Sequence, residues 1–144
     1  MSILLSKSST YSLRATLYIA ASGGEKYMPV RKIAEELHIS FHFLAKILQT
    51  LTQNGILKAF RGPNGGVALA KPAREILISD IVNAFEGRKY FDQCIMGLPN
   101  CGEATPCPLH EKWLHTQIQI RDLFEGTTLQ DQADRIREMD LRLN

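Results

Sequence analysis

Three cysteines and one histidine gather in a 17-residue stretch of this 144-residue chain. Six residues separate Cys94 from Cys101, five separate Cys101 from Cys107, and two separate Cys107 from His110. Three thiolates and an imidazole are the four donors that a tetrahedral zinc ion or an iron–sulfur cluster needs. Structural zinc usually takes a ligand pair from a gap of about two to four residues, so the wider gaps here favour a bulkier iron–sulfur cluster. Zinc is the alternative.

Other interpretations of these four residues stay open. An odd number of clustered cysteines argues against a disulfide framework, but a regulatory disulfide between two of them, or free thiols beside a solvent-facing histidine, fits the same residues. Cys107 and His110 also suit a nucleophile and its base. No oxyanion-hole loop, third orienting residue or phosphate cradle accompanies that pair, so we expect that the protein is not an enzyme.

The cysteines lie in a segment that cannot form a long regular element. Residues 87–108 contain three glycines and three prolines, which predicts an unusually long loop, and loops of that length are often functional. Ser79 is expected to cap a short helix that precedes this loop. Pro108 is expected to open a long helix that ends at Gly126. The apolar residues of this long helix occupy more than one face, which favours packing against a second copy of the chain. The candidate dimerisation residues are Leu109, Trp113, Ile120 and Phe124.

The amino-terminal half predicts three helices in succession. Ser8, Ser9 or Thr10 can cap the first helix, and Gly23-Gly24 ends it. A short helix with apolar residues at i, i+3, i+4 and i+7 follows Pro29, and a third helix begins after Ser40 and ends at Asn54-Gly55. Only residues 38–40 separate the second helix from the third. This is the helix-turn-helix pattern, in which the second helix of the pair lies in the DNA major groove.

Two short apolar segments, 56–60 and 67–70, flank the sequence Arg61-Gly62-Pro63-Asn64-Gly65-Gly66 and predict a β-hairpin. A helix-turn-helix followed by a hairpin is a winged helix. We therefore predict a mainly α fold with a small β-hairpin, in which a winged helix-turn-helix domain is joined to a long dimerisation helix. The expected divisions are a DNA-binding domain over 1–86, a cluster-binding loop over 87–108, and a dimerisation helix with a C-terminal helix over 109–144. A final helix is expected at the Thr128–Asp131 capping pattern.

Charge and hydropathy narrow the function classes. Residues 1–90 hold 12 Lys and Arg against 6 Asp and Glu, whereas residues 91–144 hold 5 against 9. A basic front of +6 and an acidic back of −4 suit a nucleic-acid-binding module joined to a part with another task. No apolar stretch approaches the roughly 18 residues that a membrane span requires, and the first residues do not form a secretory signal. We expect a cytoplasmic protein.

The residues described so far resemble the IscR and NsrR group of bacterial winged-helix regulators, the Rrf2 family. The resemblance runs from Ser6-Lys7 and Tyr11, through Ile39-Ser40 with Leu44 and Leu48, to the wing motif 61–66, which is its most specific part. Cys107-Pro108-Leu109-His110 with Trp113 is similar to the IscR pattern. That likeness implies a 2Fe-2S cluster whose ligands are Cys94, Cys101, Cys107 and His110. NsrR-like members are thought to hold a 4Fe-4S cluster with an acidic ligand near the N-terminus, where this chain has Thr10.

The same resemblance implies DNA-binding positions. Base-reading residues would lie at the start of the third helix, the wing would contribute Arg61, Gly62 and Asn64, and Lys7 would contact a phosphate. The third-helix candidates are Ser40, His42, Phe43, Ala45 and Lys46, although Phe43 also suits the core. The implied function is a homodimeric transcriptional regulator of a double-stranded DNA operator, with DNA affinity modulated by the cluster. The alternatives are a regulator with structural zinc or a thiol/disulfide switch, and a protein-interaction subunit that uses the winged helix as a docking surface.

Overall fold

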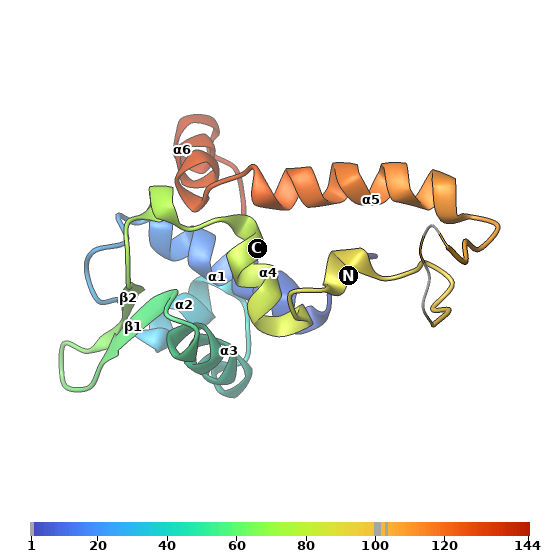
Figure 1. The fold of residues 1–144 in the computed structure, drawn as a ribbon. Helices are drawn as coiled ribbons and strands as arrows, with labels where there is room; N and C mark the ends of the chain where they lie inside the picture. Colours follow the sequence, from blue (N-terminus) through green and yellow to red (C-terminus); the bar gives the residue numbers. More distant parts are fainter. Residues whose placement is uncertain (1, 100–101, 103) are drawn as a thin grey trace.

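The computed structural model describes residues 2–99, 102 and 104–144. These residues form six α-helices and one antiparallel hairpin that projects from the edge of the molecule beside α2 and α3, and α5 extends away from the body (Figure 1). Two 3-10 turns, η1 (Ala73–Glu75) and η2 (Tyr90–Asp92), interrupt the connections. The elements are α1 (Lys7–Ala21), α2 (Val30–Leu37), α3 (Phe41–Gln53), β1 (Leu57–Phe60), β2 (Gly66–Leu69), α4 (Ile78–Glu86), α5 (His110–Glu125) and α6 (Leu129–Met139). The predicted fold class, a mainly α winged helix with a hairpin, is confirmed.

Helix α1 forms the centre of the core. It packs against α3, α4 and α6, and its residues Ala15, Thr16 and Ile19 are almost wholly shielded from solvent. The apolar residues that recur every three or four positions in α2 and α3 complete the core from the other side, among them Ile33, Leu44, Leu48 and Leu51. The helix-turn-helix is therefore fixed to α1 by buried side chains.

Helix α1 begins earlier than its sequence indicates. Ser6, not Ser8, Ser9 or Thr10, is the N-cap, and its hydroxyl accepts the backbone N–H of Ser9. The Oγ of Ser9 is instead used inside the fold, where it donates to the Glu86 carboxylate. Because that acceptor lies 77 residues away in the chain, local sequence could not show that the Ser9 hydroxyl is used inside the fold and not as a cap.

Two other predicted helix starts are also corrected. Ser79 does not cap α4: it is buried inside the helix, and the helix begins after Leu77, whose N–H donates to the Asp80 carboxylate. Pro108 does not open α5, which begins at His110 with Leu109 as its N-cap residue. The turn of chain from Cys107 to His110 precedes α5, and the His110 N–H donates to the Cys107 carbonyl at 3.0 Å.

Strands β1 and β2 pair from Leu57 with Leu69 to Phe60 with Gly66, leaving residues 61–65 as the hairpin tip. Gly66 is required where the hairpin meets the chain before α2. It has φ +154°, and a Cβ there would lie 2.0 Å from the Met28 carbonyl oxygen. Met28 and Val67 also exchange backbone hydrogen bonds of 2.8 and 2.9 Å. The wing is thereby held in a fixed position relative to the start of α2.

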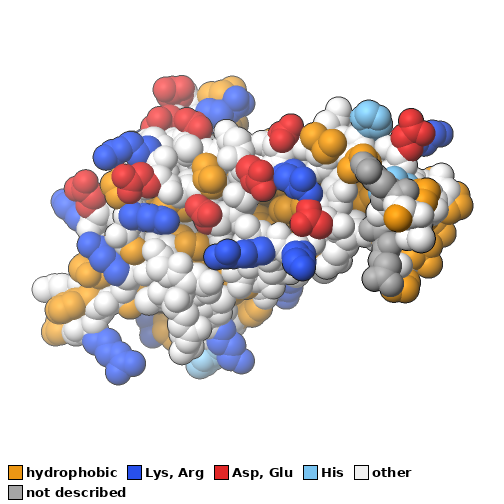
Figure 2. Space-filling model, in the orientation of Figure 1, with side chains coloured by type: hydrophobic (Ala, Val, Ile, Leu, Met, Phe, Trp, Pro, Cys, Tyr) orange, Lys and Arg blue, Asp and Glu red, His pale blue; other side chains and the backbone are white. Residues whose placement is uncertain are grey.

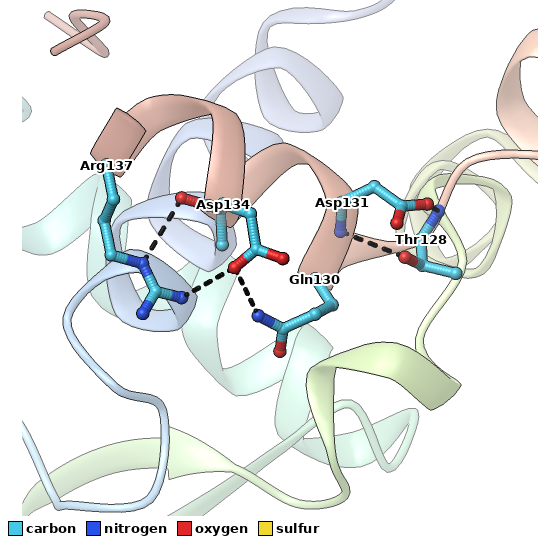
Figure 3. A network of polar contacts seen from close by, with 6 residues as sticks. Thr128, Gln130, Asp131, Asp134 and Arg137 are labelled. Atoms are coloured by element: carbon cyan, nitrogen blue, oxygen red, sulfur yellow. Dashed lines mark hydrogen bonds and ion pairs between the residues drawn. The ribbon is translucent and has the colours of Figure 1, made fainter. Parts of the chain in front are cut away.

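Helix α6 returns to the amino-terminal core. Its predicted capping box forms, since the Thr128 hydroxyl accepts from the Asp131 N–H, and Asp134 accepts from both Gln130 and Arg137 (Figure 3). The Leu129 N–H donates to Ile76 and the Ile78 N–H donates to Thr127, so the start of α6 is joined to the start of α4. Helix α6 thus packs against α1, and its start is hydrogen-bonded to the start of α4.

None of the helices in the described part of the chain combines the length and the apolar character needed to cross a membrane.

Candidate nucleic-acid interface and cysteine site

The turn between α2 and α3 is built by local backbone geometry and one buried side chain. His38 ends α2 in the left-handed conformation, with φ 53°, and the N–H of Ile39 donates to the Ala34 carbonyl. Ile39 is buried beneath the turn. Ser40 then occupies the N-cap position of α3 without a side-chain capping bond. Ser40 and the first two residues of α3, Phe41 and His42, are exposed.

Six of the predicted DNA-binding residues are exposed, either at the start of α3 or at the hairpin tip. They are Ser40, His42, Lys46, Arg61, Gly62 and Asn64. In Figure 2 the lower edge of the molecule, over α3 and the wing, shows Lys, Arg and His side chains and no Asp or Glu. This edge is the electropositive surface that phosphate binding requires.

Phe43 and Lys7 lie beside this surface in a different arrangement. Phe43 is half-buried and packs edge-on against Tyr11 of α1, with ring centroids 5.6 Å apart. The Lys7 ammonium lies 5.3 Å from the Phe43 ring centroid and 5.7 Å from that of Tyr11. Phe43 thus fixes α3 to α1, and Lys7 is exposed above this contact. Ala45 lines the groove between α3 and the hairpin.

Two of the predicted metal ligands lie together. The Sγ atoms of Cys94 and Cys107 are 3.8 Å apart, and Cys107 is buried. His110 follows Cys107 by one turn of chain. Cys101, the third predicted cysteine ligand, lies outside the described residues. No group of three His, Cys, Asp or Glu side chains with metal-site geometry occurs among the residues that are described.

Helix α5 anchors both sides of the cysteine pair. It begins three residues after Cys107, and its Trp113 Nε1 and Gln117 Nε2 both donate to the Gln93 carbonyl, at 2.8 and 3.3 Å. Gln93 directly precedes Cys94, so the segment that contains Cys94 is hydrogen-bonded to the same helix that follows Cys107. A cavity of about 140 Å³ lies beside them, lined by Leu4, Tyr90, Phe91, Gln93, Cys94, Trp113, Gln117 and Ile120.

The donor geometry fits a metal centre. Two thiolates on one tetrahedral metal, each bonded at about 2.3 Å, are separated by about 3.8 Å, which is the separation of the Cys94 and Cys107 sulfurs. Iron in a cluster and zinc share this bond length closely enough that the pair suits either. The spacing of Cys94 and Cys107 is therefore compatible with two ligands of one metal atom.

A carboxylate connects the loop to the DNA-binding half. Glu86, the last residue of α4, accepts from the Ser6 N–H at 2.8 Å and from the Ser9 hydroxyl at 2.6 Å. Burial alone raises the pKa of Glu86, but these hydrogen bonds outweigh it and hold the pKa below its usual value. Burial and the nearby Glu86 charge raise the pKa of Tyr90, whose hydroxyl donates to the Leu4 carbonyl. The segment before α1 is thus held at both ends by residues next to the cysteine loop.

The candidate dimerisation residues divide between the inside and the outside of the protomer. Phe124 is 8% exposed and stacks on Phe91, with ring centroids 5.0 Å apart, so it belongs to the chain's own core. Ile120 and Trp113 are half-buried, and Leu109 is exposed. The apolar side chains that α5 leaves exposed are Leu114, Ile118 and Leu123, and spacing alone did not single them out.

Comparison with known proteins agrees with this architecture. A family model described as an iron-dependent transcriptional regulator, Rrf2, matches residues 5–135. A helix-turn-helix-type transcriptional regulator of Aquifex aeolicus is 34% identical over 131 residues, which cover 90% of each chain. The regulator IscR of Pectobacterium carotovorum is 28% identical over 127 residues, covering 88% of this chain and 77% of its own.

A solved structure extends the likeness to three dimensions. The structure of CymR, the global cysteine regulator of Bacillus subtilis, superposes with a TM-score of 0.78 at 25% identity and covers 92% of this chain and 98% of its own. The helix-turn-helix, the wing and the matched length together show that this chain belongs to the Rrf2 family of transcriptional regulators.

Proposed function

We propose that the protein is a cytoplasmic homodimeric transcriptional regulator whose affinity for a double-stranded DNA operator is modulated by an iron–sulfur cluster. Cys94, Cys101, Cys107 and His110 would hold the cluster. The observation that carries the proposal is the 3.8 Å Cys94–Cys107 sulfur pair fastened to α5 next to a winged helix. DNA binding itself is the activity of the family, and the cluster is what the proposal adds.

The proposed DNA contacts come from the start of α3, the wing and Lys7. Helix α3 would enter the major groove with Ser40, His42 and Lys46 at its leading end, and Arg61 at the wing tip would reach the neighbouring minor groove. Lys7 would contribute a phosphate contact. Gly62 and Asn64 would let the wing backbone approach the duplex closely.

The dimer part rests on α5. Leu114 and Ile118, 39% and 44% exposed and one helical turn apart, offer a small apolar patch to a second copy on a helix that stands clear of the body (Figure 1). Leu123, 63% exposed, lies on the opposite side of the helix from Leu114. Leu109 precedes the helix, and Trp113 and Ile120 are half-buried. Two winged helices related by the dimer axis would then read two half-sites about one helical turn apart.

The regulatory part rests on the position of the loop. An iron–sulfur cluster supplies chemistry that responds to iron supply, redox state or nitric oxide. The chain's own contribution is to hold Cys94 against α5 through the Gln93 carbonyl and to place Cys107 directly before α5. Glu86 links the start of the loop to the start of α1. A change in ligand positions therefore acts on the helix proposed to join the subunits and on the helix that supports α3.

The first experiment is anaerobic purification followed by iron, sulfide and zinc analysis and electron paramagnetic resonance of the dithionite-reduced protein. Iron and sulfide near two each per chain, lost in Cys107→Ser, support a 2Fe-2S cluster, and about four of each indicate 4Fe-4S. His110→Ala should alter the visible spectrum, whereas His115→Ala, a matched change at an exposed α5 position, should not. Zinc alone, or no metal, would overturn the cluster and favour a structural zinc site or a thiol/disulfide switch.

The second experiment compares DNA affinity with and without the cluster. Fluorescence anisotropy with a duplex that this protein enriches from genomic fragments should give dissociation constants that differ at least fivefold between the two forms. Equal affinities would contradict modulation while leaving DNA binding intact. Failure to enrich any fragment would favour the interaction-subunit alternative.

A further inference from the structure

A groove of about 770 Å³ separates α3 from the hairpin, and the start of α2 closes one end of it. Its charged lining residues are Arg31 and Arg61, and no carboxylate belongs to its described lining. Two aromatic side chains line the same groove and are unusually open to solvent for their size: Phe41 is 45% and Phe60 is 54% exposed. The groove therefore combines positive charge with exposed apolar surface.

Phe60 is exposed because the hairpin buries little of β1. Of the four β1 residues only Leu57 is buried. The Phe60 ring is nevertheless held in place, tilted at 42° against Tyr27 with centroids 5.5 Å apart. Lys58 is on the same strand as Phe60, and its ammonium group lies 5.6 Å from the Tyr27 ring centroid. Phe60 is thus an ordered apolar surface directly before Arg61, and it contributes nothing to the core.

Phe41 faces it from the first position of α3. Its ring lies 5.8 Å from the guanidinium of Arg31 and 5.8 Å from the ring of His42. Two residues later in the chain, Phe43 packs against α1 instead. Arg31 and Phe41 therefore line the groove as a cation–π pair. A guanidinium group stacked on an aromatic ring can still pair with a phosphate.

One strand of a DNA duplex presents the chemistry that this groove complements. Its backbone alternates anionic phosphates with deoxyribose rings, whose carbon-rich faces are apolar. Contacts to sugar and phosphate position a protein on the duplex without reading sequence. In a winged helix the strand between the major groove read by α3 and the minor groove reached by the wing must pass between these two elements.

Building on the proposed DNA binding, we propose that this groove seats one sugar–phosphate strand. Phe41 and Phe60 pack against its deoxyribose rings from the two sides, and Arg31 binds a phosphate at the α2 end. Arg31, Phe41 and Phe60 are thus positioning residues for DNA, distinct from the base-reading residues of α3 and from the wing tip.

The phosphate contact and the sugar contacts can be distinguished by how DNA affinity depends on salt concentration. Each phosphate contact releases counterions and contributes about 0.9 to the slope of log affinity against log salt, whereas an apolar sugar contact contributes nothing to that slope. Removing a phenyl ring that buries a few tens of Å² against sugar should lower affinity about fivefold per bound protomer.

The experiment measures fluorescence anisotropy at several KCl concentrations from 50 to 200 mM. The probes are a 40-base-pair duplex enriched by this protein from a random pool and a 40-base-pair duplex of random sequence. Phe41→Ala and Phe60→Ala should weaken binding to both duplexes about fivefold with an unchanged salt slope, and Phe60→Leu should recover part of the loss. Arg31→Ala should lower the slope by about 0.9 per bound protomer. Met139→Ala, which truncates a 58% exposed side chain on α6, is the control and should leave affinity and slope unchanged.

Several outcomes would overturn the proposal. If wild type binds both duplexes but the two phenylalanine variants bind within twofold of it, the sugar contact is absent. If Arg31→Ala leaves the slope unchanged, the phosphate contact is absent. If the phenylalanine variants change the sedimentation coefficient of the free protein instead of DNA affinity, the aromatic residues face a second copy. Wild type that binds neither duplex would refute the proposed function itself. Urea unfolding of each variant verifies that the comparison is made between folded proteins.

Discussion

Glu86→Ala is the most informative single change in this molecule, because one carboxylate connects the end of α4 to the start of α1. It removes an acceptor from the Ser9 hydroxyl at 2.6 Å and from the Ser6 N–H at 2.8 Å. Ser9 is 0% exposed, so its hydroxyl loses its acceptor in a buried place, at a cost of about 1–3 kcal/mol. Ser6 is exposed, so water replaces its lost bond at little cost. Water entering beside Ser9 reduces the effect, and we expect a loss of about 2 kcal/mol.

The assay is urea unfolding followed by circular dichroism, with Ser9→Ala and the double variant completing a cycle. Glu86→Gln, which keeps an oxygen acceptor but not the charge, should lose about half as much as Glu86→Ala. In the Ser9→Ala background Glu86→Ala should cost about 1 kcal/mol less than in wild type. Additive single effects, or a Glu86→Ala loss below about 0.3 kcal/mol, would refute the assignment of this contact as the connection between the two helices.

The pH dependence gives an independent check of the same contact. Because hydrogen bonds lower the pKa of Glu86 in the folded protein, its contribution is present above the unfolded-state pKa of about 4.3. That contribution is lost as the pH falls through the folded-state value. The stability difference between wild type and Glu86→Ala should therefore be constant above about pH 5 and shrink below pH 4. A difference that grows on acidification would contradict the direction of the pKa shift.

The other predictions concern the wing, the subunit contact and the cysteines. Gly66→Ala, whose Cβ would meet the Met28 carbonyl at 2.0 Å, should cost about 3 kcal/mol or more in urea unfolding, whereas Gly102→Ala, with open space around it, should be neutral. Ile118→Glu should yield monomers in sedimentation velocity without loss of helical content, and a dimer of unchanged stability would exclude the α5 face. Cys107→Ser should lose iron and sulfide while its melting temperature without metal stays within about 3 °C of the metal-free wild type; unfolding would indicate that the thiol is needed for the core.

Local sequence rules predicted elements whose determinants are neighbours in the chain. The i, i+4 apolar spacing of α2 and α3 and the Thr128–Asp131 box are of this kind, and all three appear in the structure. Phe41 and Phe43 show where such rules stop. One lies three residues before Leu44 and the other four before Ile47, so both suit a buried face. Tyr11 of α1 decides between them by packing on Phe43.

The cysteine site was also predictable only in part. Cysteine spacing predicts a site in the loop, and the structure places Cys94 and Cys107 together. The anchoring of the loop by Trp113 and Gln117 through the Gln93 carbonyl left no sequence signature, because any residue at position 93 supplies that carbonyl. Periodicity alone predicts a subunit contact for Phe124. Its actual partner, Phe91, belongs to the long loop, where no periodicity exists to reveal it.

Helix α5 separates the cysteine pair from the protein core. It is 16 residues long, or about 24 Å, with Phe124 buried in the core near its carboxyl end and the cysteine pair beside its amino end. A displacement of about 2 Å at the sulfur atoms therefore corresponds to a rotation of the helix by about 5° about its carboxyl end. In a dimer joined through α5 the two bodies would turn in opposite senses. The distance between the two α3 helices would then change, whereas the helical repeat of the duplex stays at about 34 Å. Movement at the cysteine pair would in this way alter DNA binding without any contact between the cysteine loop and DNA.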